Sequence, residues 1–245
     1  MDYDLKGKRI LVQGASTGIG FAIAKAYAKE GAIVAISSSN LEKITKAAHE
    51  IEKATGFVCD AFQEGAGTSL VWQVIEKLGG LDILVTNTVN PPKQLFMQTS
   101  LEDWRKSFQA VFMSAVESIL EALHPMKQQK FGRIILNTSV VAKEPSPQLT
   151  ISSSLRAGLL GMMKSLSQEM APYNITVNAL LPGFIKTAML LDRFHNVDEI
   201  AQGIPNKRLG EPEELAALAV FLGSKQASYI TGQAIACDGG LMKGF

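Results

Sequence analysis

The chain has 245 residues, of which 47% are hydrophobic and 19% charged, enough apolar material for one α/β domain spanning residues 1–245. A net charge of +1 excludes the strongly basic surface of a typical nucleic-acid or anionic-membrane binder. The chain has two cysteines without metal-ligand spacing, no signal-peptide segment and no apolar run of membrane-spanning length. We therefore expect a cytoplasmic protein in a reducing compartment, without a metal site.

Short aliphatic runs alternate with longer helical patterns along the chain, which is typical of a parallel sheet built from βαβ units. The predicted strands are residues 9–12, 33–37, 56–59, 81–86, 132–137, 176–181 and 233–237. The predicted helices are residues 18–30, 40–54, 65–78, 100–124, 149–171 and 211–223. This order predicts one doubly wound, Rossmann-type parallel sheet of seven strands with helices on both faces. No helix is assigned to residues 188–204, which, like the loop 142–147, we expect to be mobile because Pro and Gly punctuate them.

The turn between the first strand and the first helix reads Gln13-Gly14-Ala15-Ser16-Thr17-Gly18-Ile19-Gly20. Its glycines allow a tight turn, a close approach to a pyrophosphate and close packing of the helix on the strand. The helix that begins near Gly18 directs free N–H groups and its positive dipole end toward the same place. The turn therefore predicts a phosphate site, although a tight turn without a ligand remains the alternative.

Several polar segments follow predicted strands, namely residues 37–40, 59–61, 86–90, 138–139 and 182–187. The carboxyl ends of parallel strands meet at one edge of a doubly wound sheet, where ligands bind beside the first strand. These segments are therefore expected to line a single ligand site together with the glycine turn.

The chain resembles the short-chain dehydrogenase/reductase family over essentially its whole length. The resemblance rests on the glycine turn and on further family motifs: Asp60, Asn87, Ser139, Pro182-Gly183 with Thr187, and Thr231-Gly232 with Asp238-Gly239-Gly240. It implies hydride transfer between a nicotinamide cofactor and a small carbonyl or alcohol substrate, as in 3-oxoacyl-carrier-protein reductases or sugar dehydrogenases. The cofactor residues that the turn and the resemblance predict are Gly14, Ser16, Thr17, Gly18, Ile19, Gly20, Ser38, Ser39, Asn40, Asp60, Ala61, Asn87, Arg156, Pro182, Gly183, Ile185 and Thr187. For Asn87, a strand-end cap without ligand contact is the alternative, since only one letter of the family's Asn-Asn-Ala-Gly survives at 86–89.

Cofactor preference depends on the residues that follow the second strand. An acidic side chain there accepts hydrogen bonds from the 2′-hydroxyl of NAD and repels the 2′-phosphate of NADP. Here the residues are Ser37, Ser38, Ser39 and Asn40, with Lys43 one turn later. This composition favours NADP(H) over NAD(H), and a solvated turn with a helix N-cap is the alternative.

The catalytic positions that the resemblance assigns carry unusual residues. Ser139 matches the family serine, whereas Ser152 stands at the tyrosine position, Arg156 at the lysine position and Val111 at the asparagine position. A serine hydroxyl is a far weaker acid than tyrosine, and arginine neither deprotonates nor replaces lysine in a tight site. We expect Ser139, Ser152 and Arg156 to form an atypical catalytic site.

Other proton donors come from nearby segments: Lys143 and Glu144 follow Ser139, and His195 lies in the stretch that could cover a substrate. A non-catalytic NADP(H)-binding protein, either a sensor or an inactive subunit, is the alternative function. The resemblance also implies a homo-oligomer, a tetramer or dimer, formed through the helices at 100–124 and 149–171. The sequence carries no signature that names the substrate.

Overall fold

In the computed structural model, which describes residues 2–52, 54–87, 89–194 and 196–244, seven parallel strands form one sheet in the order β3-β2-β1-β4-β5-β6-β7. The strands are β1 (Arg9–Val12), β2 (Ile33–Ser38), β3 (Ala54–Val58), β4 (Ile83–Asn87), β5 (Gly132–Asn137), β6 (Ile175–Pro182) and β7 (Ala234–Cys237). The order reverses beside β1, which pairs with both β2 and β4. This reversal is the switch point at which open α/β sheets bind ligands.

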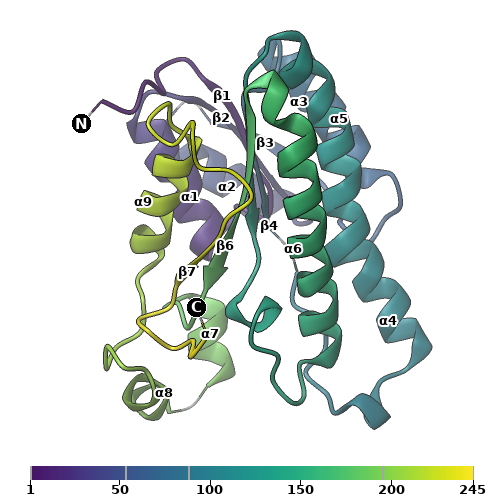
Figure 1. Ribbon diagram of the computed structural model, residues 1–245, viewed down its shortest axis with the longest axis vertical. Helices are drawn as coiled ribbons and strands as arrows, with labels where there is room; N and C mark the ends of the chain where they lie inside the picture. The colour runs from purple at the N-terminus through teal and green to yellow at the C-terminus, as the bar shows by residue number, and fades with distance from the viewer. Residues whose placement is uncertain (1, 53, 88, 195, 245) are drawn as a thin grey trace.

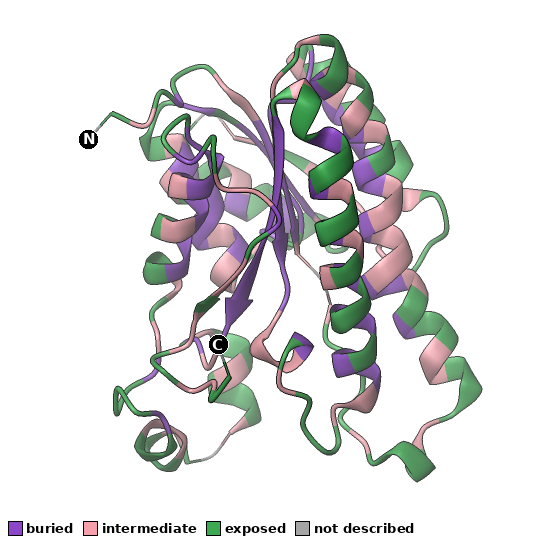
Figure 2. Cartoon of the chain, viewed as in Figure 1, coloured by how far each residue is buried: buried purple, intermediate pink, exposed green. Residues whose placement is uncertain are grey.

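Helices cover both faces of the sheet, as the sequence predicts (Figure 1). One face carries α1 (Gly18–Lys29), α2 (Leu41–Glu50) and α9 (Pro212–Gly223), and the other carries α3 (Ala66–Leu78), α5 (Ser114–Gln128) and α6 (Thr150–Met170). Each strand feeds both cores, because Ile10 and Val12 of β1 point to the first face and Leu11 to the second. Figure 2 accordingly shows the central strands buried and the outer helix surfaces exposed.

The observed elements depart from the predicted ones in two places on the core helices. Helix α2 ends at Glu50 rather than near residue 54, because Ala54 already pairs with Val34 in the sheet. The single helix predicted at 100–124 is α4 (Leu101–Ser107), a π-helical segment (Phe108–Met113) and then α5.

The sequence predicts no helix at residues 188–204, and this prediction is wrong. Two short helices form there, α7 (Ala188–Arg193) and α8 (Val197–Gly203). Each begins at a side-chain cap: the Thr187 hydroxyl accepts from the Leu190 N–H, and the Asn196 side chain accepts from the Glu199 N–H. Among the described helices, none is long and apolar enough to cross a membrane.

Candidate functional site

The glycine turn leaves the first turn of α1 open to an anion. Gly14 and Gly18 have positive φ values of 58° and 61°, and a Cβ on Gly20 would overlap the carbonyl oxygen of Gly14. Thr17, the N-cap residue, makes no capping bond with its side chain, and no acidic residue occupies the first turn. The turn therefore fits a phosphate group, because no capping side chain occupies the first N–H groups of α1 and the glycines let the backbone turn tightly.

Asn87 at the end of β4 holds this turn in place. Its Nδ2 donates to the carbonyl oxygen of Gly14 at 3.1 Å, and its Oδ1 accepts from Asn137 Nδ2 at 3.0 Å. Asn87 thus links the ends of β1, β4 and β5, and it also lines the cleft described next.

A cleft of about 530 Å³ opens at the carboxyl edge of the sheet. It brings together twelve of the residues predicted from the sequence: Gly14, Thr17, Gly18, Ile19, Asn87, Ser139, Ser152, Arg156, Pro182, Gly183, Ile185 and Thr187. It is not lined by Ser16, Gly20, Ser38, Ser39, Asn40, Asp60 or Ala61. A Cβ on Gly18 would contact Thr187 Cγ2 at 3.2 Å, so the loop after β6 lies directly over the start of α1. The phosphate-type turn and the predicted catalytic serines thus share one cleft.

The segment after β2 is held by local hydrogen bonds. Asn40 is the N-cap of α2, and its Oδ1 accepts from the Lys43 N–H at 2.9 Å. The Ser38 hydroxyl accepts from the Asn40 N–H at 3.3 Å, while Asp60 after β3 accepts from the Phe62 N–H at 3.1 Å. Asn40 therefore caps α2, and the serines lie beside it without an acidic neighbour in the segment.

Ser152 and Arg156 lie one turn apart on α6 and are both buried. Arg156 Nη1 donates to Ser152 Oγ at 3.0 Å, and Nη2 donates to the Val89 carbonyl at 3.2 Å and to Asn90 Oδ1 at 3.4 Å. Burial lowers the pKa of Arg156 to about 10, so the guanidinium keeps its charge at neutral pH. Its Nε has no hydrogen-bond partner in the part of the chain that the structure describes. The pair therefore presents a positive charge behind the Ser152 hydroxyl.

Three other residues that the sequence singled out, Val111, Lys143 and Glu144, do not line the cleft. Val111 is fully buried in the π-helical segment and does not line it. Lys143 Nζ donates to the Ala234 carbonyl, and Glu144 Oε1 accepts backbone N–H groups near the C-terminus. His195 lies outside the described residues.

Asn90 and Phe184 belong to the segments predicted to line the site, whereas sequence reasoning did not single out six further lining residues: Lys93, Gln148, Leu149, Met189, Arg193 and Phe194. Phe184 and Phe194 pack edge to face at 6.2 Å between ring centroids, which anchors α7 on the loop after β6. The N-cap signal of Thr187 was the available clue to α7. Within the described chain, no cluster of three or more His, Cys, Asp or Glu residues could hold a metal ion.

Comparisons with known proteins agree with this geometry. A family model described as enoyl-(acyl carrier protein) reductase matches residues 14–242. The chain is 38% identical over 254 residues to the NADPH-dependent reductase BacG of Bacillus subtilis (strain 168), covering 95% of this chain and 96% of that protein. It is 35% identical over 243 residues to the 3-oxoacyl-[acyl-carrier-protein] reductase FabG of Chlamydia muridarum (strain MoPn / Nigg), covering 97% and 98%. The crystal structure of L-sorbose reductase from Gluconobacter frateurii, complexed with NADPH and L-sorbose, superposes with a TM-score of 0.94 at 30% identity and covers 100% of both chains.

Proposed function

Because the chain belongs to the short-chain dehydrogenase/reductase family and is therefore an oxidoreductase, we propose that it reduces a small carbonyl compound with NADPH, or oxidises the corresponding alcohol, through an atypical active site. One observation carries the proposal: the phosphate-type turn at Gly14 and the polar group Ser139, Ser152 and Arg156 line the same cleft.

The cofactor assignment rests on the glycine turn and on the end of β2. The open first turn of α1 would hold the diphosphate, and Ser38 and Ser39 would meet the adenosine ribose. No carboxylate is present at residues 37–40 to repel a 2′-phosphate. The NADPH-dependent relative and the NADPH-bound sorbose reductase support the same preference. When bound, NADPH supplies the hydride.

In reduction, the carbonyl carbon gains a hydride and the carbonyl oxygen becomes an alkoxide. We propose that the hydroxyl groups of Ser139 and Ser152 donate hydrogen bonds to this oxygen. Arg156 already donates to Ser152 Oγ, so the Ser152 proton is free to point into the cleft. The buried guanidinium stabilises the developing negative charge, because electrostatic stabilisation is strong where water is excluded.

The proton that completes the alcohol then comes from water. Serine is too weak an acid to replace tyrosine, and Arg156 stays protonated at neutral pH. Lys143 and Glu144 bond to groups outside the cleft, which supports a solvent proton over a donor from that loop.

We also propose that the protein is a homo-oligomer, a tetramer or dimer, that contacts its copies through α4, α5 and α6. The exposed Leu120 of α5 supports such a contact. The two free cysteines, Cys59 and Cys237, fit a reducing compartment, and we place the protein in the cytoplasm.

The test begins with a titration of the purified protein with NADPH and, separately, with NADH. Nicotinamide fluorescence measures the binding. We expect NADPH to bind at least tenfold more tightly. A panel of ketones, aldehydes and sugars is then added to the complex and turnover is measured. The same panel is run with the double variant Ser152→Tyr/Arg156→Lys, which restores the family residues, and with Ser154→Tyr, a control on the exposed side of α6.

The native protein should turn over a member of the panel, and the double variant should be no faster, because the native Ser152–Arg156 contact is lost. A gain of about 10²–10⁴-fold in the double variant would instead indicate that Ser152 and Arg156 do not promote the reaction and only stand in place of the missing general acid. Tight NADPH binding without turnover by either protein would favour a non-catalytic cofactor-binding protein.

A further inference from the structure

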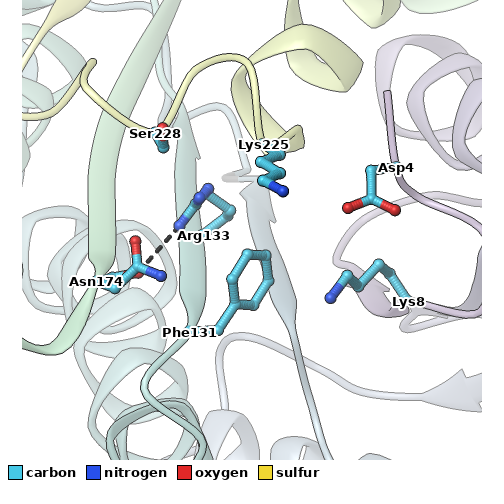
Figure 3. Close-up of a pocket in the computed structure, with 8 residues that line it drawn as sticks. Asp4, Lys8, Phe131, Arg133, Asn174, Lys225 and Ser228 are labelled. Atoms are coloured by element: carbon cyan, nitrogen blue, oxygen red, sulfur yellow. Dashed lines mark hydrogen bonds between the residues drawn. The ribbon is translucent and has the colours of Figure 1, made fainter. Parts of the chain in front are cut away.

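Figure 3 shows a second cavity, of about 340 Å³. It lies at the amino edge of the sheet, opposite the cofactor cleft. Its lining comes from residues at the amino ends of β1, β5 and β6 and from the end of α9 and the segment after it: Asp4, Lys8, Phe131, Arg133, Asn174, Gly223, Lys225 and Ser228. The proposed hydride transfer uses none of these residues.

Arg133 forms the floor of this cavity and is only 1% exposed. Its Nη1 donates to the carbonyl oxygens of Gly132 at 2.8 Å and Asn174 at 3.0 Å, and its Nε donates to the Ser224 carbonyl at 3.4 Å. No described residue accepts a hydrogen bond from Nη2, and no described carboxylate bonds to this guanidinium. A buried charge is normally paired, so Arg133 lacks its counter-ion.

Two lysines face the same space. Lys8 Nζ lies 4.2 Å from the centroid of the Phe131 ring, and Arg133 Cζ lies 4.4 Å from it, so the ring positions both cations. Figure 3 shows Lys225 entering from the segment after α9, opposite Phe131. Neither lysine forms an ion pair within the described residues.

The charge of this cavity does not balance. Arg133, Lys8 and Lys225 contribute three positive charges, and Asp4 is the one carboxylate among the described lining residues, which leaves +2. Asp82, close enough to Lys8 to interact with it, already accepts three hydrogen bonds from Arg9. Asp82 is therefore paired with Arg9 and does not neutralise the charge of the cavity.

We propose that this cavity binds a phosphate dianion, either inorganic phosphate or the phosphate of a small monoester. A phosphate carries a charge of about −1.5 to −2 at pH 7 and offers oxygens to several donors at once. A guanidinium with a free N–H and two ammonium groups form strong, charge-assisted hydrogen bonds with such an anion. The net charge of the cavity matches a dianion better than a single carboxylate.

The test is a titration of ¹⁵N-labelled protein with inorganic phosphate at constant ionic strength, with chloride as the exchanged anion. Backbone amide signals of Arg133, Asn174, Lys225 and Ser228 report on this cavity, and those of Gly14 and Gly18 report separately on the cofactor cleft. A parallel titration with glycerol 3-phosphate distinguishes a monoester from inorganic phosphate. Lys225→Gln and Asp4→Asn change the cavity through exposed side chains, and Lys77→Gln, an exposed lysine on α3, is the matched control.

We expect a saturable shift of the cavity signals. Lys225→Gln should weaken binding at least fivefold, Asp4→Asn should tighten it, and Lys77→Gln should leave it unchanged. Stronger binding of glycerol 3-phosphate would assign a monoester as the ligand, and weaker binding would assign inorganic phosphate. Cavity signals that do not saturate, or a loss of affinity in Lys77→Gln equal to that in Lys225→Gln, would overturn the proposal.

Discussion

Two arginines, Arg133 and Arg156, are buried without a carboxylate bonded to them in the described chain. Backbone carbonyls hold Arg133, and a hydroxyl, a carbonyl and an amide hold Arg156. Burial lowers the pKa of each to about 10. Arg9 shows the ordinary arrangement, since its guanidinium bonds directly to Asp82 at 2.8 Å. The protein thus keeps uncompensated positive charge at both edges of its sheet, where an anionic ligand gains most from it.

At the same scale, Glu214 on α9 makes stability depend on pH. The hydrogen bonds of Arg208, at 2.7 Å, and the N–H of Glu211 lower the pKa of Glu214 to about 2. Because the folded pKa lies below the unfolded value of about 4.3, this contribution is present above that value and is lost as pH falls toward 2. Denaturant unfolding between pH 2 and 6 measures this effect. The free energy of unfolding of the native protein should exceed that of Glu214→Gln at pH 6, and the difference should shrink as pH falls.

Glu213→Gln is the control for this comparison, because it removes a charge from the same exposed turn but leaves the Arg208–Glu214 bonds in place. The difference in the free energy of unfolding between Glu213→Gln and the native protein should not follow the same pH profile. A Glu214→Gln difference that stays constant from pH 6 to pH 2 would contradict the assignment.

At the scale of elements, two helical glycines differ in how closely neighbouring parts of the chain pack against them. Gly67 of α3 packs against α5: a Cβ there would lie 2.6 Å from the Ser114 carbonyl oxygen and 2.7 Å from Ser118 Oγ. Gly161 of α6 has no atom within 4 Å of the same added group. Gly67 is therefore required by packing within the chain, whereas Gly161 is not.

These two glycines predict opposite effects of the same substitution. Gly67→Ala should lower the free energy of unfolding by about 1–3 kcal/mol, because α3 and α5 must separate. Gly161→Ala should raise it by about 0.5–1 kcal/mol, because alanine is the better residue inside a helix. Urea unfolding measures both, and a loss of equal size in the two variants would contradict this view of α3–α5 packing.

At the scale of the whole molecule, the outer surface carries large apolar side chains. Leu120 of α5 is 60% exposed, and Leu41 of α2, on the opposite face of the sheet, is 67% exposed. Single exposed leucines are ordinary. Of these two leucines, Leu120 lies on the helices through which we propose that copies of the chain assemble.

Sedimentation velocity tests this assembly. The native protein should sediment as an oligomer, Leu120→Glu should sediment as a smaller species because a charge would be buried at the contact, and Leu41→Glu should match the native protein. A monomeric native protein, or dissociation of Leu41→Glu alone, would show that α5 is not a contact between subunits.

The sequence by itself determined the parallel sheet and the glycine turn at its carboxyl edge. The predicted strands 9–12 and 132–137 coincide with β1 and β5, because short aliphatic runs between turn residues have few alternatives in an α/β chain. The glycine turn is equally local, since positive φ at Gly14 and Gly18 is a backbone requirement that only glycine meets easily. Strand-end geometry predicted Ser139 beside that turn, whereas Ser152 and Arg156, on a predicted helix, were assigned to the site by the family resemblance. All three line the cleft.

Only the tertiary structure decided what these residues contact. Arg156 reaches the Val89 carbonyl, 67 positions away in the chain, and the second cavity joins Lys8, Phe131 and Lys225. Helix α7 depends on Phe194 packing against Phe184 as well as on its cap. Periodicity and turn chemistry act over a few residues, whereas these contacts depend on how distant elements pack. Their partners are therefore selected by the fold as a whole.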